Sequence, residues 1–219
     1  MKKDLTELVF ILDRSGSMSG LEKDTIGGFN SMLAKQKSEP GDALVTTVLF
    51  DHDYEMLHDR EKIKNVDEIS EQEYFVRGST ALLDAMGRTI NYIGKSISDT
   101  GEDDHPGKVI FVIITDGMEN SSHEFSKAKV KRMVEHQKTK YSWEFVFLGA
   151  NIDAVKTAAD FGIDEDRASN FCADGQGINL NYSAVSTFVS EMRMGKKVDS
   201  SWKSKIDEDY KKRGKKGPS

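Results

Sequence analysis

Apolar positions divide the chain into two alternating kinds of segment. Strand-like runs, several of them apolar enough to be buried on both faces of a sheet, lie at residues 8–12, 44–50, 54–58, 109–114, 143–149 and 168–173. Segments with an apolar residue every three or four positions predict amphipathic helices at about 21–37, 80–97, 126–137, 153–161 and 182–192.

This alternation of strands and helices predicts an α/β fold. Parallel strands joined by right-handed crossovers form a doubly wound, Rossmann-like sheet, here with six mostly parallel strands and helices on both faces. One edge strand is expected to be antiparallel, because the turn Asp51-His52-Asp53 between 44–50 and 54–58 is too short for a crossover. The charged segment 59–77 is expected to be a loop, and Gly27-Gly28 predicts close packing of the first helix against a strand.

Composition narrows the class of protein. A net charge of −6 with 31% charged residues is that of an ordinary acidic protein, which argues against nonspecific nucleic-acid binding by the globular part. The single cysteine, Cys172, excludes an internal disulfide and a cysteine-rich metal site, and we expect it to pack in the edge strand. Because no segment has the length of a membrane span, we expect no membrane contact and a cytoplasmic location.

The C-terminal end differs in charge from the rest of the chain. Residues 196–219 hold nine basic and four acidic residues, so we divide the chain into a globular domain, 1–195, and a basic tail, 196–219. Trp202, Ile206 and Tyr210 lie four apart and would form an apolar stripe on a helix. Two hypotheses follow, a stripe that docks on the domain itself and a basic arm that binds an acidic partner.

Polar residues with oxygen side chains follow two of the buried strands and precede one helix. They are Asp13, Ser15, Ser17, Thr80 and Asp116. Each taken alone has an ordinary structural explanation as a helix cap or a turn residue. Ligands of open α/β sheets bind beyond the carboxyl ends of the strands, which is where these loops would meet. Carboxylate and hydroxyl oxygens suit a hard cation such as Mg²⁺ or Mn²⁺.

The three loops together carry a family resemblance. Their sequences are Ile-Leu-Asp-Arg-Ser-Gly-Ser-Met, Gly-Ser-Thr-Ala-Leu-Leu-Asp-Ala and Ile-Ile-Thr-Asp-Gly-Met-Glu-Asn. In this order they resemble the metal-ion-dependent adhesion site of von Willebrand factor type A domains, and the resemblance spans about residues 7–195. It implies that the hydroxyls of Ser15, Ser17 and Thr80 bind a metal ion, and that Asp13 and Asp116 act directly or through water. The implied ion is Mg²⁺ or Mn²⁺, with Ca²⁺ as a further candidate.

The ligand set also predicts a function. An ion held largely by neutral oxygens stays electrophilic and keeps a position for an incoming carboxylate. We therefore expect a binding module, not an enzyme, whose ion captures an Asp or Glu side chain of a partner protein; the sequence does not specify the oligomeric state.

Two alternatives remain open. The first is a regulatory or assembly subunit beside an AAA-type ATPase or in a stress-response system resembling tellurite resistance, as in intracellular bacterial relatives of this family. The second is a haloacid dehalogenase-type phosphatase, which needs an acid two residues after its nucleophilic aspartate, where this chain has Ser15.

Three further sequence features are weaker candidates for a functional site. His52 and His58 with the neighbouring Asp51, Asp53 and Asp59 resemble a second metal site on the edge hairpin. Met18 and Met118 follow two of the metal loops and form either an apolar rim for the partner or packing beneath the loops. The segment 174–177 lacks the full glycine set of a dinucleotide-binding loop.

Overall fold

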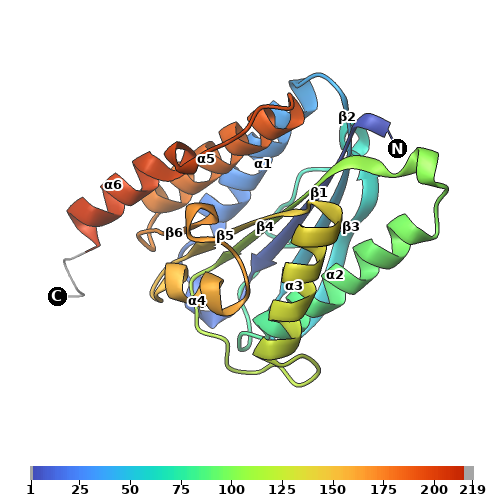
Figure 1. Ribbon diagram of the computed structural model, residues 1–219. Coiled ribbons are helices and arrows are strands. Elements are labelled where there is room, and N and C mark those ends of the chain that lie inside the picture. Colours follow the sequence, from blue (N-terminus) through green and yellow to red (C-terminus); the bar gives the residue numbers. More distant parts are fainter. Residues whose placement is uncertain (1, 215–219) are drawn as a thin grey trace.

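The computed structural model describes residues 2–214 and contains one sheet of six strands in the order β3-β2-β1-β4-β5-β6 (Figure 1). The strands are β1 (Lys2–Asp13), β2 (Asp42–Phe50), β3 (Tyr54–Lys62), β4 (Pro106–Thr115), β5 (Glu144–Gly149) and β6 (Ala168–Asn170). All neighbouring strands are parallel except β2 and β3, which pair antiparallel at one edge. The predicted mostly parallel sheet with one antiparallel edge strand is therefore confirmed.

Helices cover both faces of the sheet (Figure 1). One face carries α1 (Glu22–Ser38) and α5 (Gly175–Arg193), and the other carries α2 (Leu82–Ser98), α3 (Lys127–Tyr141) and α4 (Ala154–Asp160). Alternate residues of β1 supply the two cores, because successive side chains of a strand point to opposite faces. Leu8, Phe10 and Leu12 belong to the core beneath α1 and α5, whereas Val9 and Ile11 belong to the core beneath α2.

Four local predictions were wrong. The segment 59–77 is not simply a loop, because β3 extends to Lys62 and the remainder buries Ile63, Val66, Ile69 and Tyr74 against the core beneath α1. Gly28 packs against α5 rather than a strand, since a β-carbon there would lie 2.2 Å from Cδ2 of Tyr182.

The other two wrong predictions concern the chain around α5. Cys172 lies beyond the edge strand, because β6 ends at Asn170. Helix α5 begins at Gly175 and not at 182, since Asp174 caps it by accepting a hydrogen bond from the Gly177 amide at 2.8 Å.

The chain after 195 continues into the same core. Helix α6 (Ser204–Arg213) follows a short 3-10 turn, Ser200–Lys203, and packs beside α5. Trp202 and Ile206 are buried, which confirms for these two residues that the apolar stripe docks on the domain itself. Within residues 2–214 no helix combines the length and apolar character needed to cross a bilayer.

Candidate metal centre

The three oxygen-bearing loops lie at the switch point of the sheet. β1 leads through α1 to β2, whereas its other neighbour β4 leads through α3 to β5, so the connections after these two adjacent strands run in opposite directions along the sheet. Asp13 is the last residue of β1, Asp116 directly follows β4, and Thr80 precedes α2. The order of the strands thus carries the three loops to one place, as the sequence predicted.

The three hydroxyls form a continuous chain of contacts. Ser15 Oγ lies 3.0 Å from Ser17 Oγ, and Thr80 Oγ1 donates a hydrogen bond to Ser15 Oγ at 2.9 Å. Gly117 closes this group from the side of β4, because a β-carbon there would lie 2.8 Å from Ser17 Oγ and 3.1 Å from Thr80 Oγ1. A glycine is needed at this position so that the loop after β4 can approach the hydroxyls.

Asp13 is held rigidly at the base of the group. One carboxylate oxygen accepts a hydrogen bond from the Ser15 amide at 2.7 Å, and the other accepts one from Thr115 Oγ1 at 2.5 Å. Burial raises the pKa of Asp13, and these hydrogen bonds oppose the rise. Sequence reasoning missed Thr115 as a supporting residue, although its place directly before Asp116 is a signal that it ends the neighbouring strand.

Asp116 is the least satisfied residue of the group. It is 1% exposed, and neither of its carboxylate oxygens has a hydrogen-bond partner among the described residues. Burial raises its pKa to about 6, the Ser17 hydroxyl opposes this rise, and the nearby Asp13 carboxylate adds to it. A buried carboxylate that lacks well-formed hydrogen bonds is costly, and a bound cation is one of the few ways to offset that cost.

Asn120 fixes the position of Thr80 through two hydrogen bonds. Its side-chain oxygen accepts a hydrogen bond from the Thr80 amide at 2.9 Å, and its own amide donates to the Thr80 carbonyl at 3.0 Å. This pair of bonds joins the loop after β4 to the start of α2. Sequence reasoning did not single out Asn120, although it stands in the third of the quoted loop sequences.

The donor set fits a hard divalent cation. It offers three neutral hydroxyl oxygens and two carboxylates, one of them buried without a partner, and it contains no thiolate or imidazole. Bound there, Mg²⁺ or Mn²⁺ would act as a Lewis acid for an incoming oxygen ligand. Ser17 and Asp116 also line a surface hollow with Asn151 and Asp174, so one side of the group faces this hollow.

The two methionines next to the loops differ in environment. Met18 is 1% exposed and belongs to the core, which supports the packing hypothesis for that residue. Met118 is 72% exposed and follows Gly117 directly. Only Met118 is therefore available as an apolar contact beside the centre.

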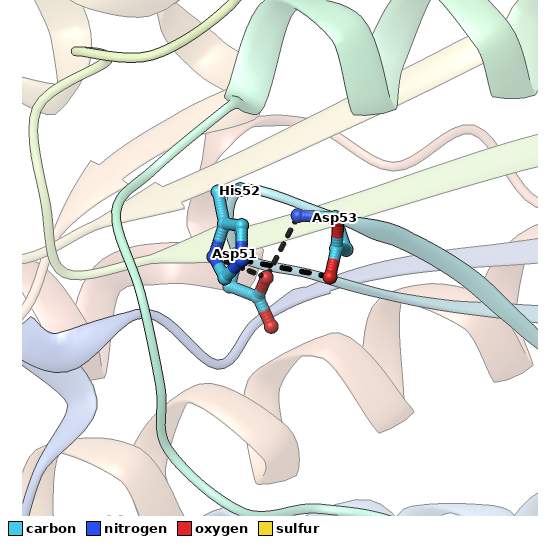
Figure 2. Close-up of side chains that lie close together, drawn as sticks. All are labelled: Asp51, His52 and Asp53. Carbon is cyan, nitrogen blue, oxygen red and sulfur yellow. Dashed lines mark hydrogen bonds and ion pairs between the residues drawn. The ribbon is translucent and has the colours of Figure 1, made fainter.

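A second group of potential ligand atoms lies in the β2–β3 turn (Figure 2). Ligand atoms of Asp51, His52 and Asp53 lie within 4.8 Å of one another. Both carboxylate oxygens of Asp51 are already engaged, however: Oδ2 by Arg14 and Arg77, and Oδ1 by the Asp53 amide and His52. Two guanidinium groups on one carboxylate leave little for a cation, so this turn is the poorer metal site.

Comparison with known proteins agrees with the geometry. No protein-family model and no curated protein matches the sequence. Among solved structures, a von Willebrand factor type A protein from Catenulispora acidiphila is 15% identical with a TM-score of 0.58, over 88% of this chain and 43% of that one. This chain therefore spans less than half of that protein.

Two further structures are similar over most of their own length. The VWA domain of SpRpn10 is 11% identical with a TM-score of 0.55, covering 82% of this chain and 94% of that one. The manganese-loaded TRAP protein of Plasmodium vivax is 13% identical with a TM-score of 0.55, covering 82% and 73%. At such identities the likeness establishes the fold alone: the chain folds as a von Willebrand factor type A domain.

Proposed function

We propose that the chain is a divalent-metal-dependent binding module. Mg²⁺ or Mn²⁺, held by Ser15, Ser17 and Thr80 with Asp13 and Asp116, captures an Asp or Glu side chain of a partner protein. The observation that carries the proposal is Asp116, a buried carboxylate whose two oxygens lack partners beside a cluster of hydroxyls. The manganese in the similar structure from Plasmodium vivax supports the choice of ion class.

The geometry does not favour the phosphatase alternative. Ser15 stands where that chemistry needs a second acid, and its hydroxyl is engaged with Ser17 and Thr80.

The proposal is tested by a pull-down from the native lysate. Proteins retained by the wild-type chain in Mg²⁺ should be lost in EDTA and lost with Ser17→Ala, but retained by Ser38→Ala, an exposed serine at the opposite end of α1. Amidation of carboxylates in the lysate with a carbodiimide should also abolish retention. Retention that is unchanged by EDTA or by Ser17→Ala would contradict the proposal.

A further inference from the structure

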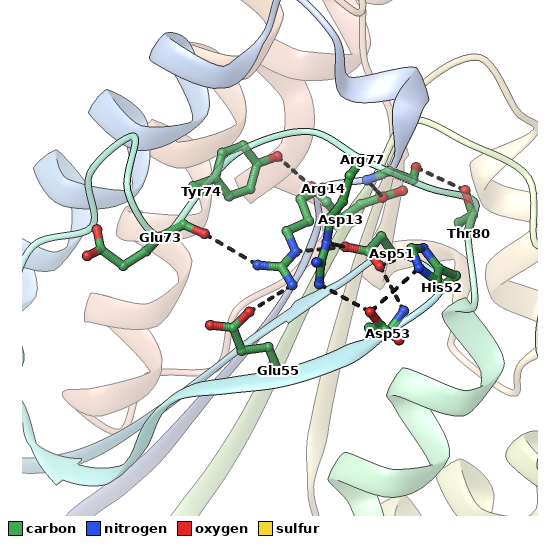
Figure 3. A network of polar contacts seen from close by, with 11 residues as sticks. Asp13, Arg14, Asp51, His52, Asp53, Glu55, Glu73, Tyr74, Arg77 and Thr80 are labelled. Atoms are coloured by element: carbon green, nitrogen blue, oxygen red, sulfur yellow. Dashed lines mark hydrogen bonds and ion pairs between the residues drawn. The ribbon is translucent and has the colours of Figure 1, made fainter.

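A buried carboxylate outside the ligand set joins the two loops that carry the hydroxyls. Asp51 directly follows β2 and has a fully buried side chain, and its Oδ2 accepts a hydrogen bond from Arg14 Nε at 2.9 Å (Figure 3). Arg14, which lies between the metal-site residues Asp13 and Ser15, also has a fully buried side chain. Its guanidinium also pairs with Glu55 at 2.8 Å and donates to the Glu73 carbonyl at 3.3 Å. Because the Glu55 side chain is 46% exposed, Asp51 is the fully buried carboxylate that balances the Arg14 charge at this depth.

The same carboxylate oxygen holds the segment that leads to Thr80. Arg77 Nε donates to Asp51 Oδ2 at 2.8 Å, and the Arg77 amide donates to the Arg14 carbonyl at 2.9 Å. Three residues later, Thr80 meets Ser15. One carboxylate between two guanidinium groups thus fixes the distance between the loop after β1 and the loop before α2.

Backbone contacts extend this connection on both sides of Asp51. The Ala81 amide donates to the Asp51 carbonyl at 2.8 Å, and the Gly16 amide donates to the Gly78 carbonyl at 3.1 Å. Tyr74, buried beneath the same segment, donates its hydroxyl to the Asp13 carbonyl at 2.5 Å. The two loops are therefore in contact along their length, with the Asp51 side chain at the buried end of the contact.

We propose that Asp51 is a positioning residue of the metal centre, which acts through Arg14 and Arg77 to bring the Ser15 and Thr80 hydroxyls within one coordination sphere. This inference rests on the proposed metal site and assigns no ligand role to Asp51. The β2–β3 turn resembles a metal site in its residue types, but its Asp51 carboxylate binds Arg14 and Arg77 in place of a metal ion.

The matched control is a second buried ion pair on β1. Glu7 is fully buried, pairs with Arg60 at 2.9 Å, and lies about 20 Å along the strand from Asp13 at roughly 3.3 Å per residue. Asp51→Asn and Glu7→Gln each remove one buried negative charge with little change of shape. Both substitutions should lower the free energy of unfolding, but only the first disturbs the metal loops.

The experiment titrates Mn²⁺ into the wild-type chain and the two variants by calorimetry, at a temperature where all are folded. Asp51→Asn should bind Mn²⁺ about ten- to a hundredfold more weakly, as is typical when a residue that orients ligands is changed, whereas Glu7→Gln should bind like the wild type. Without metal, the Gly16 and Arg77 amides should exchange with solvent faster in Asp51→Asn than in Glu7→Gln.

Equal Mn²⁺ affinity in Asp51→Asn and wild type, or equal weakening in both variants, would overturn the positioning role. If Asp51→Asn does not fold, Arg77→Met decides the question. Arg77 is 39% exposed, and in its absence the buried Asp51 carboxylate is still paired with Arg14. Severalfold weaker binding by Arg77→Met supports the role, and unchanged binding overturns it. A wild-type chain that binds no Mn²⁺ would instead contradict the proposed function itself.

Discussion

Asp116 combines two properties that are rarely found together in a stable fold. Its carboxylate is buried, and neither oxygen has a partner at hydrogen-bond geometry among the described residues, although the Ser17 hydroxyl lies close enough to lower its pKa. Such a group lowers the stability of the metal-free protein, and a bound cation would offset this cost.

Asp116→Asn should therefore change stability and binding in opposite directions. Removing the uncompensated charge should raise the free energy of unfolding of the metal-free protein by about 1–3 kcal/mol. Mn²⁺ should no longer stabilise the variant. Urea unfolding with and without Mn²⁺ measures both effects, and a variant that is less stable than the wild type without metal would contradict this view of Asp116.

Asp84 is a buried carboxylate in the opposite situation. It accepts hydrogen bonds from the amides of His123, Glu124 and Phe125 at 2.8–2.9 Å. Burial alone would raise its pKa, but the three amides together hold it below the ordinary value of 3.8. The carboxylate thereby orders the end of the loop that begins at Asp116.

This shift predicts how stability depends on pH. Since the folded pKa of Asp84 is lowered, its contribution is complete above the unfolded value of 3.8 and is lost as the pH falls through the folded value. Asp84→Asn should cost about 1–2 kcal/mol at pH 7. The difference from wild type should shrink below about pH 4. Chemical unfolding measures this, and a difference in the free energy of unfolding between wild type and Asp84→Asn that stays constant from pH 7 to pH 3 would contradict the assigned role of Asp84.

At the scale of elements, the contact between α1 and α5 depends on one of two adjacent glycines. A β-carbon at Gly28 would collide with the Tyr182 ring, whereas a β-carbon at Gly27 would meet nothing within 4 Å. Gly28→Ala should destabilise the fold by about 1–3 kcal/mol through overpacking. Gly27→Ala should stabilise it by about 0.5–1 kcal/mol, because alanine is the better helix former. Thermal unfolding of the two variants separates the cases, and equal midpoints would count against this packing.

The 3-10 turn before α6, Ser200–Lys203, covers the edge strand β6. The Lys203 ammonium is buried and donates to the carbonyls of Ala168 at 2.6 Å and Glu165 at 2.8 Å. Lys203→Met should cost about 1–3 kcal/mol because two carbonyls lose their donor. Lys205→Met, at an exposed position in the first turn of α6, should be nearly neutral. Similar urea midpoints for both variants would show that the cover contributes little.

The elements themselves were largely predictable because hydrophobic periodicity is a local signal. The predicted helix 21–37 is observed at Glu22–Ser38, and the strand 44–50 lies within Asp42–Phe50. The errors fall where a distant residue decides the outcome. Gly28 marks close packing in the sequence, but only the folded chain brings Tyr182 to it. Tyr74 in the charged segment is likewise buried by distant residues of the core beneath α1, and its hydroxyl donates to the Asp13 carbonyl, far away in the sequence.

At the scale of the whole molecule, the candidate centre follows from strand order. The loops after β1 and β4 meet because these strands are neighbours at the switch point, and this rule is accessible from the sequence pattern. The support around the centre is less accessible. Arg14, Asp51 and Arg77 come from three separate segments, and nothing in their local sequences indicates that one carboxylate pairs with both arginines.

The most direct measurement is a crystal structure of the chain grown with Mn²⁺, with anomalous diffraction used to locate the ion. We expect one strong anomalous peak between the Ser15, Ser17 and Thr80 hydroxyls and the carboxylates of Asp13 and Asp116. No peak there, or a peak only at Asp51, His52 and Asp53, would contradict the assignment of the metal centre.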